Sequence, residues 1–154
     1  MISSSDRGIL RDLARQVKDI AVLSTQAERR ELWKKHNSLQ PTRPMILVFP
    51  EGSWEELLTN KMLQCEGEEA RHIEWDLRSR IYYHEHFQDD TVIEREYFVQ
   101  KVIRDSGWGL EKRSIPSPAA RGSWKFDPVI KSPSDLELLR FPEISYDREA
   151  TEQK

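Results

Sequence analysis

The feature that most limits the fold of this 154-residue chain is its longest apolar run, Met45 to Phe49, which lies between Pro44 and Pro50. Five residues are far too few to span a bilayer, since a membrane helix needs about 20. Flanking prolines disfavour a helix, and an apolar run without alternation is typical of a strand buried on both faces. We therefore predict one buried, barrel-type strand at residues 45–49.

Helical spacing dominates the chain before this run. Apolar residues recur every three or four positions over 9–21, and Asp6 is a candidate N-cap for this helix. Thr25 and Glu28 form a capping box that predicts the start of a second helix. Residues 1–40 are therefore predicted to form a helical hairpin that extends the rest of the fold.

A long helix is predicted from about Glu68 to Phe87. Two acid-first pairs four residues apart, Glu74 with Arg78 and Asp76 with Arg80, are expected on its exposed surface. Such pairs stabilise a helix by a few tenths of a kcal/mol each.

Short strands are predicted in the last third of the chain. β-Branched and aromatic residues over 91–103 predict one long or two short strands, and residues 124–130 another. Ser132 and Asp135 predict the capped start of a compact helix, while residues 144–154 carry no clear pattern. Residues 41–154 are thus interpreted as one partial α/β segment, and the fold class as α+β or partial α/β.

Composition excludes several functional classes. The net charge is −3, and no block of lysine or arginine stands out, which argues against nucleic-acid binding. The N-terminal sequence lacks the apolar core of a signal peptide, and no run spans a membrane. Cys65 is the single cysteine, so no intrachain disulfide can form. We expect a soluble, cytoplasmic protein.

The stretch RIYYHEHFQDD, residues 80–90, places four ligand-type side chains close together: His84, His86, Asp89 and Asp90. These residue types bind metals and transfer protons. Two residues along a helix are about 200° apart, however, so the imidazoles should diverge. We expect His84 to pack on the core, His86 to face solvent, and Asp89 with Asp90 to end the helix. A metal-dependent hydrolase built on His84, His86 and Asp89 is therefore the least favoured hypothesis.

Other chemical candidates are weaker. Cys65 is surrounded by glutamates at positions 66, 68 and 69, whose charge should raise the pKa of the thiol. No phosphate-binding loop, dinucleotide fingerprint, serine-hydrolase elbow or zinc-protease motif occurs. Trp108 and Trp124, with His84, are candidates for a ligand or partner surface, although tryptophans more often anchor a core. We assign no catalytic, cofactor-binding or metal-binding residue.

Several long phrases of the chain resemble those of a known family. They are AERRELWKKHNSLQPTRPMILVFPEG, DDTVIEREYFV, IRDSGWGLE and WKFDPVIKSPSDLELLRFPEISYDREAT. Together they resemble the N-terminal portion of the uroporphyrinogen decarboxylase-like proteins. The resemblance is to the branch of corrinoid-dependent methyltransferases and demethylases.

The resemblance implies a TIM barrel, which takes about 200–250 residues. This chain alone is incomplete for such a barrel and would supply the helical extension and one early strand. A barrel-completing chain or further sequence would supply the rest. Zinc and a corrinoid protein would serve the full-length relative, and no residue here matches the family's zinc ligands. The segment Phe49–Gly52 also lacks the arginines that bind substrate carboxylates in the decarboxylase, so decarboxylation is not expected.

Two functions follow as hypotheses. The first is an N-terminal fragment or subunit of such a methyltransferase-like protein, inactive alone. The alternative is a standalone α+β module that binds a ligand or another protein. Either one is compatible with an oligomer.

Overall fold

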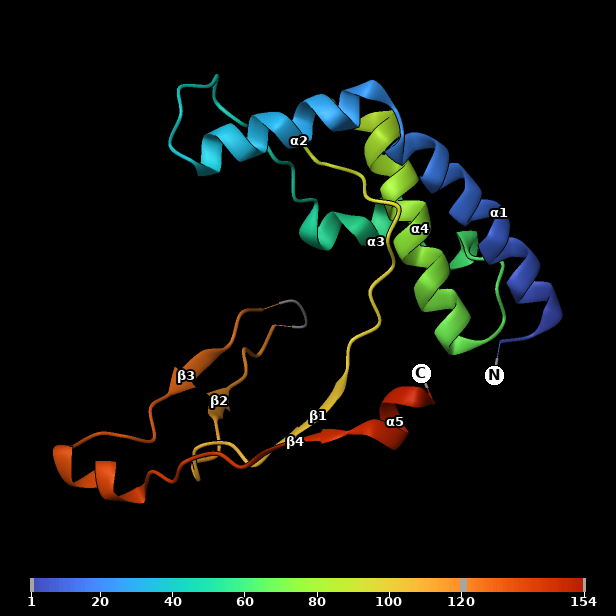
Figure 1. Cartoon of the computed structure of the whole chain (residues 1–154). Helices are drawn as coiled ribbons and strands as arrows, with labels where there is room; N and C mark the ends of the chain where they lie inside the picture. The colour runs from blue at the N-terminus through green and yellow to red at the C-terminus, as the bar shows by residue number, and fades with distance from the viewer. Residues whose placement is uncertain (1, 120–121, 154) are drawn as a thin grey trace. The chain divides into compact units, whose positions relative to one another are not determined.

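The computed structural model describes residues 2–119 and 122–153, which belong to two compact units. The N-terminal unit comprises residues 1–96 and the C-terminal unit residues 97–154 (Figure 1). Helices and short antiparallel strands are both present, so the predicted α+β class is confirmed. The described strands form two-stranded sheets and no barrel. No helix in the described residues is long and apolar enough to cross a membrane.

Helices make up most of the N-terminal unit. They are α1 (Ser4–Ala21), α2 (Ser24–Asn37), α3 (Trp54–Leu57) and α4 (Glu68–His86), with short 3-10 turns η1 (Glu51–Ser53) and η2 (Asn60–Met62). The long helix predicted to end at Phe87 is confirmed to within one residue.

The start of α1 differs from the predicted one. Ser3 is the N-cap, and its hydroxyl accepts a hydrogen bond from the backbone N–H of Asp6 at 3.1 Å. Asp6 lies inside the first turn, where its buried carboxylate accepts from the backbone N–H groups of Glu66 (3.0 Å) and Gly67 (3.2 Å). The prediction of Asp6 as N-cap is therefore wrong, because this carboxylate joins the start of α1 to the start of α4.

The capping box predicted at Thr25 and Glu28 is also wrong. α2 begins directly after Leu23, and no side chain caps it. Its one buried residue is polar: Gln26 is fully buried, and its Oε1 accepts from the backbone N–H of Ile93 at 2.8 Å.

The hydrophobic core lies between α1 and α4, which run side by side (Figure 1). Its buried residues are Leu13, Val17, Leu77 and Ile93. The predicted hairpin of the first two helices is wrong, because α1 packs against α4 rather than against α2. The apolar stripe of α1 requires an apolar partner face, and α4 offers Leu77 where α2 buries a glutamine.

The buried strand predicted at residues 45–49 is not observed. These residues form no ladder with another strand, and four of them are exposed: Ile46, Leu47, Val48 and Phe49. The partial α/β interpretation, which depended on this strand, is therefore wrong for the described structure. The backbone of the segment is held by side chains of the N-terminal unit.

The C-terminal unit contains two antiparallel strand pairs. β1 (Val102–Asp105) pairs with β4 (Ile144–Asp147), with Arg104 opposite Ser145, and β2 (Arg113–Ile115) pairs with β3 (Lys125–Asp127). The short helix α5 (Arg148–Glu152) follows β4. Residues 91–101 form no strand, so only the end of the predicted 91–103 strand is confirmed. The last strand and helix lie in the segment for which no element was predicted.

The predicted capped helix of this unit is confirmed as a 3-10 helix, η3 (Pro133–Leu138). Ser132 is its N-cap, and the Asp135 carboxylate accepts from the backbone N–H of Ser132 at 2.8 Å. None of the described residues of the C-terminal unit is buried. Backbone pairing and local turns, without an apolar core, therefore define this unit.

Candidate functional site

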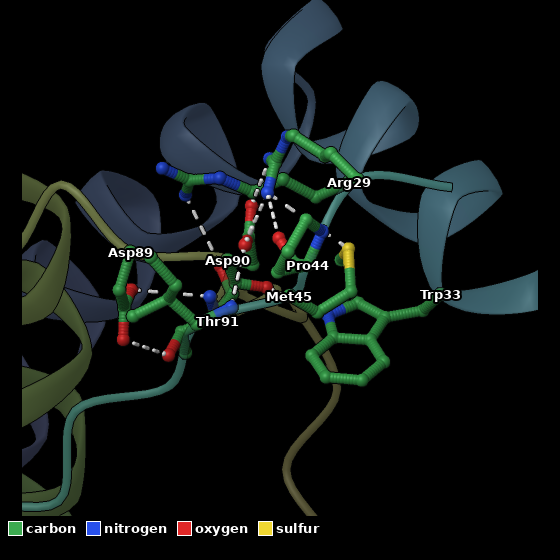
Figure 2. A network of polar contacts seen from close by, with 9 residues as sticks. Arg29, Trp33, Pro44, Met45, Asp89, Asp90 and Thr91 are labelled. Atoms are coloured by element: carbon green, nitrogen blue, oxygen red, sulfur yellow. Dashed lines mark hydrogen bonds and ion pairs between the residues drawn. The ribbon is translucent and has the colours of Figure 1, made fainter. Parts of the chain in front are cut away.

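Two adjacent carboxylates lie just beyond the C-terminal end of α4. Asp89 and Asp90 are each 5% exposed, a degree of burial that carboxylates rarely reach without partners. Burying two acids side by side costs free energy unless hydrogen bonds or opposite charges compensate. The two residues were expected only to end the helix, and they are instead the centre of a polar network (Figure 2).

Arg43 provides the opposite charge for Asp90. Its guanidinium contacts both carboxylate oxygens, with Nη1 2.7 Å from Oδ2 and Nη2 hydrogen-bonded to Oδ1. The backbone N–H of Ile46 also donates to Oδ2, at 2.8 Å. The hydrogen bonds from Arg43, followed by that from Ile46, lower the pKa of Asp90 to about 2 although burial opposes this shift.

Asp89 binds the backbone of Val48, two residues after Ile46. Its Oδ2 accepts from the backbone N–H of Val48 at 3.0 Å and from the Thr91 hydroxyl at 2.7 Å. The backbone of Asp90 is held as well: its N–H donates to the carbonyl of Ile46 at 2.8 Å. Its carbonyl accepts from the indole N–H of Trp33, also at 2.8 Å (Figure 2). We call these contacts the Asp89–Asp90 network.

The Asp89–Asp90 network has a structural role rather than a catalytic one. Asp90 is ionised at neutral pH and therefore carries no proton to donate. Its oxygens are already occupied by Arg43 and Ile46, and those of Asp89 by Val48 and Thr91. The network fastens residues 43–48 to the end of α4.

A pocket of about 360 Å³ lies beside this network. Its lining includes Arg29, Arg43, His84 and both aspartates. His84 is exposed, so the prediction that it packs on the core is wrong. The helix places Leu77 and Ile81 toward the core, and by position 84 the core has ended.

His86 is exposed, as predicted, and its ring lies against that of Tyr82 with centroids 4.2 Å apart. The metal hypothesis needed His84, His86 and Asp89 together. In residues 2–119 and 122–153, no three histidine, cysteine or acidic side chains are placed to hold a metal ion. The described residues therefore do not fit a zinc site, and we derive no step that uses zinc or a corrinoid.

Another buried carboxylate, that of Glu74, lies within α4. Glu74 is fully buried, and its oxygens accept from the backbone N–H groups of Gln64 (2.9 Å) and Cys65 (2.7 Å) and from Nε of Arg78 (2.7 Å). Burial raises the pKa of Glu74, but these hydrogen bonds outweigh it and lower the pKa below its ordinary value. The predicted pairing of Glu74 with Arg78 is confirmed, whereas the prediction that Glu74 lies on the exposed surface is wrong.

Cys65 is buried at 1% exposure against Glu74 and Asp6. Burial first, and then these two carboxylates, raise the pKa of its thiol to about 12. The predicted direction of the shift is confirmed, although the acids responsible are not the neighbouring glutamates in the sequence. Such a thiol is a poor nucleophile.

The tryptophans divide between the two units. In the N-terminal unit, Trp54 packs edge-on against Trp75 and Tyr82, with centroids 5.4 and 5.7 Å apart. In the C-terminal unit, Trp108 is 54% exposed and Trp124 is 58% exposed. The reading of these two as core anchors is therefore wrong, and a surface role stays a prediction.

Each exposed tryptophan has one aromatic neighbour. Trp108 lies 5.8 Å from Phe141, and Trp124 lies 4.7 Å from Phe126, between ring centroids. Trp124 and Phe126 also line a groove of about 310 Å³ with Lys112 and Ser114. That groove does not include Trp108.

Local sequence patterns carry no indication of the Asp89–Asp90 network. Arg43 and Asp90 are 47 positions apart, and neither carries a local pattern that indicates the other. The burial of Gln26 was not predicted either, because its partner Ile93 lies 67 positions away and a glutamine in a polar helix is normally exposed.

No protein-family model, curated protein or solved structure matches this chain. The resemblance to the uroporphyrinogen decarboxylase-like proteins therefore stays a prediction.

Proposed function

We propose that this chain is an interaction subunit or part of a larger protein, inactive on its own, whose C-terminal unit folds onto a partner. We further propose that the partner is the barrel of a uroporphyrinogen decarboxylase-like protein of the corrinoid-dependent methyltransferase branch. The barrel would supply the catalytic residues, and this chain would supply part of the surface that encloses them.

One observation carries the proposal: the C-terminal unit exposes large apolar side chains and buries none of its described residues. Residues more than half exposed in this unit are Phe98, Val99, Ile103, Trp108, Ile115, Trp124, Phe126, Leu136, Phe141 and Ile144. Single exposed apolar residues are normal, but many in one small unit indicate a surface that another protein covers.

The total exposed area of the chain also supports a surface that a partner covers. The chain exposes 12454 Å². Two compact proteins of the two units' sizes, fully separated, would together expose roughly 9,700 Å². The excess of roughly 2,800 Å² exceeds one partner's share of a permanent interface, which is roughly 1,000–2,500 Å².

The chemistry of the described residues supports a non-catalytic role. The four buried acids among the described residues all accept hydrogen bonds from backbone N–H groups or arginine, and the one thiol is buried. These acids are Asp6, Glu74, Asp89 and Asp90. The choice of a barrel as partner depends on the resemblance alone.

The test is co-expression with a uroporphyrinogen decarboxylase-like barrel chain from the same genome, prepared without its own N-terminal helical part. We expect a stable 1:1 complex on size-exclusion chromatography and methyl transfer to a corrinoid protein by the complex only. The double variant Trp108→Ser, Phe141→Ser should weaken the complex at least tenfold. Leu39→Ser is the matched control, since Leu39 is 94% exposed and lies in the N-terminal unit.

Two results would overturn the proposal. One is activity of the isolated chain at the rate of the complex. The other is a mixture in which neither component alters the elution of the other at concentrations well above those of the cell.

The groove at Trp124 favours a second candidate, a module that binds an apolar ligand. Its walls are the rings of Trp124 and Phe126, with Lys112 beside them. A ligand in the groove should quench Trp124 fluorescence, and Trp124→Phe should remove that signal while Trp108→Phe retains it. Identical quenching in both variants would exclude the groove as the binding site.

A further inference from the structure

The segment Met45–Phe49 uses its backbone groups on one side only. The N–H groups of Ile46 and Val48 donate to Asp90 and Asp89, and their carbonyls accept from the Asp90 N–H and the Tyr83 hydroxyl. Partners at every second residue are the pattern of an extended strand, in which alternate residues direct their N–H and C=O to the same edge. The even-numbered edge is therefore closed by the side chains of Tyr83, Asp89 and Asp90 and by the backbone N–H of Asp90.

The odd-numbered edge is open. The backbone N–H and C=O groups of Met45, Leu47 and Phe49 have no hydrogen-bond partner among the described residues. Four of the five side chains are exposed as well, from 38% at Val48 to 70% at Phe49, and Met45 is half-buried. An exposed apolar strand edge of this kind readily pairs with another chain.

The sequence around this edge is nearly symmetric about Leu47. Pro44 and Pro50 lie three residues to either side, Met45 and Phe49 lie two residues away, and the ends are Arg43 and Glu51. In an antiparallel pair of two identical segments centred on Leu47, each arginine position therefore lies beside a glutamate position. Arg43 is 52% exposed despite its ion pair with Asp90, so its charge reaches this region.

We propose that two copies of this chain pair through residues 45–49 as antiparallel strands, with Leu47 of one copy opposite Leu47 of the other. Met45 of each copy then lies opposite Phe49 of the other. Each of the three opposed pairs exchanges two N–H···O=C bonds, because the open groups belong to these residues. The flanking prolines lack N–H groups and limit the pairing to five residues. This inference is independent of the proposed function.

The first experiment is sedimentation equilibrium over a range of concentrations. We expect a monomer–dimer equilibrium in the wild type. Leu47→Pro should weaken the dimer at least tenfold, since it removes two hydrogen bonds at the centre of the pair. Leu47→Ala keeps both N–H groups and should weaken it less. Both variants should fold, because the Leu47 N–H has no hydrogen-bond partner among the described residues. Thermal melting checks that each variant is folded.

The second experiment fixes the register by disulfide cross-linking in a Cys65→Ala background. Directly opposed residues in an antiparallel pair are about 5.5 Å apart between Cα atoms, which a disulfide can span. We expect Leu47→Cys to cross-link with itself at least ten times faster than Met45→Cys with itself. A mixture of Met45→Cys and Phe49→Cys should form the mixed dimer. Leu39→Cys is the exposed control.

Three results would overturn the proposed pairing. A chain that stays monomeric at high concentration overturns the proposal. So does a dimer that Leu47→Pro leaves intact, since association then uses another surface, such as that of the C-terminal unit. Rapid self-linking of Met45→Cys would indicate a parallel pair and would also overturn it.

Discussion

Arg43 and Asp90 lie 47 positions apart and form a two-pronged ion pair, with one of its hydrogen bonds at 2.7 Å. The arginine side chain is 52% exposed, whereas the aspartate side chain is 7% exposed. The pair therefore joins the surface segment after α2 to the buried end of α4. It holds residues 45–49 in the extended form on which the proposed pairing depends.

Removing the charge of Asp90 should destabilise the N-terminal unit. Asp90→Asn retains one acceptor oxygen but loses the charge that binds Arg43. Hydrogen bonds to charged groups contribute about 1.5–3 kcal/mol each, and we expect a loss of about 2 kcal/mol because Arg43 is half exposed. Urea unfolding followed by circular dichroism measures this change.

Asp12→Asn is the matched control for that experiment. Asp12 pairs with Arg15 at 2.6 Å, but both side chains are about 70% exposed (69% and 73%). An ion pair of this kind contributes little to stability. Equal destabilisation by the two variants would contradict the role given to Asp90.

The contribution of Asp90 should depend on pH in a defined direction. Its folded pKa is lowered from 3.8 to about 2, so the folded state favours the ionised form. The stability this confers is fully present above pH 3.8 and is lost as the pH falls through about 2. The difference in unfolding free energy between wild type and Asp90→Asn should therefore be constant above pH 5 and shrink steadily towards pH 2. A difference that grows as the solution is acidified would contradict the assignment.

Glu74 offers a comparison between a buried and an exposed i,i+4 ion pair of equal length, with the acid first in one pair and second in the other. Glu74–Arg78 and Glu152–Arg148 are both i,i+4 pairs at 2.7 Å, but Glu74 is fully buried and Glu152 is 63% exposed. Glu74→Gln should cost about 3 kcal/mol, since it leaves backbone N–H groups and Arg78 without an ionised acceptor. Glu152→Gln should have little effect. Thermal denaturation of both variants measures the contrast.

The thiol of Cys65 should be unreactive in the folded protein. Its side chain is 1% exposed, and burial with the nearby carboxylates raises its pKa to about 12. We expect no reaction with a thiol-specific disulfide reagent at pH 8 until urea unfolds the N-terminal unit. Glu74→Gln should hasten the reaction by loosening the contacts around residue 65. Immediate stoichiometric labelling of the native chain would show that the thiol is accessible.

Local patterns predicted the elements that local interactions determine. The periodicity of α1 and α4 and the capping of η3 by Ser132 each depend on residues within a few positions of one another, and each was predicted correctly. The start of α1 was predicted wrongly because a distant contact decides it: Asp6 binds the backbone at Glu66 and Gly67.

The apolar run Met45–Phe49 shows the limit of such reasoning. Its composition is typical of a buried strand, but burial needs neighbouring strands, and the described residues supply none beside it. Side-chain carboxylates of Asp89 and Asp90 take the place of a strand on one edge. A periodicity of two or of 3.6 residues carries no signal for that arrangement.

The central claim is that the C-terminal unit, lacking a buried core, needs a partner to become stable, and hydrogen–deuterium exchange of the isolated full chain tests it most directly. Peptides of α1 and α4 should exchange slowly, because Leu13, Val17 and Leu77 form a core between them. Peptides from residues 97–153 should exchange within seconds and gain protection when the barrel chain is added. Protection of the C-terminal unit in the isolated chain, at a level equal to that of α1 and α4, would contradict the claim.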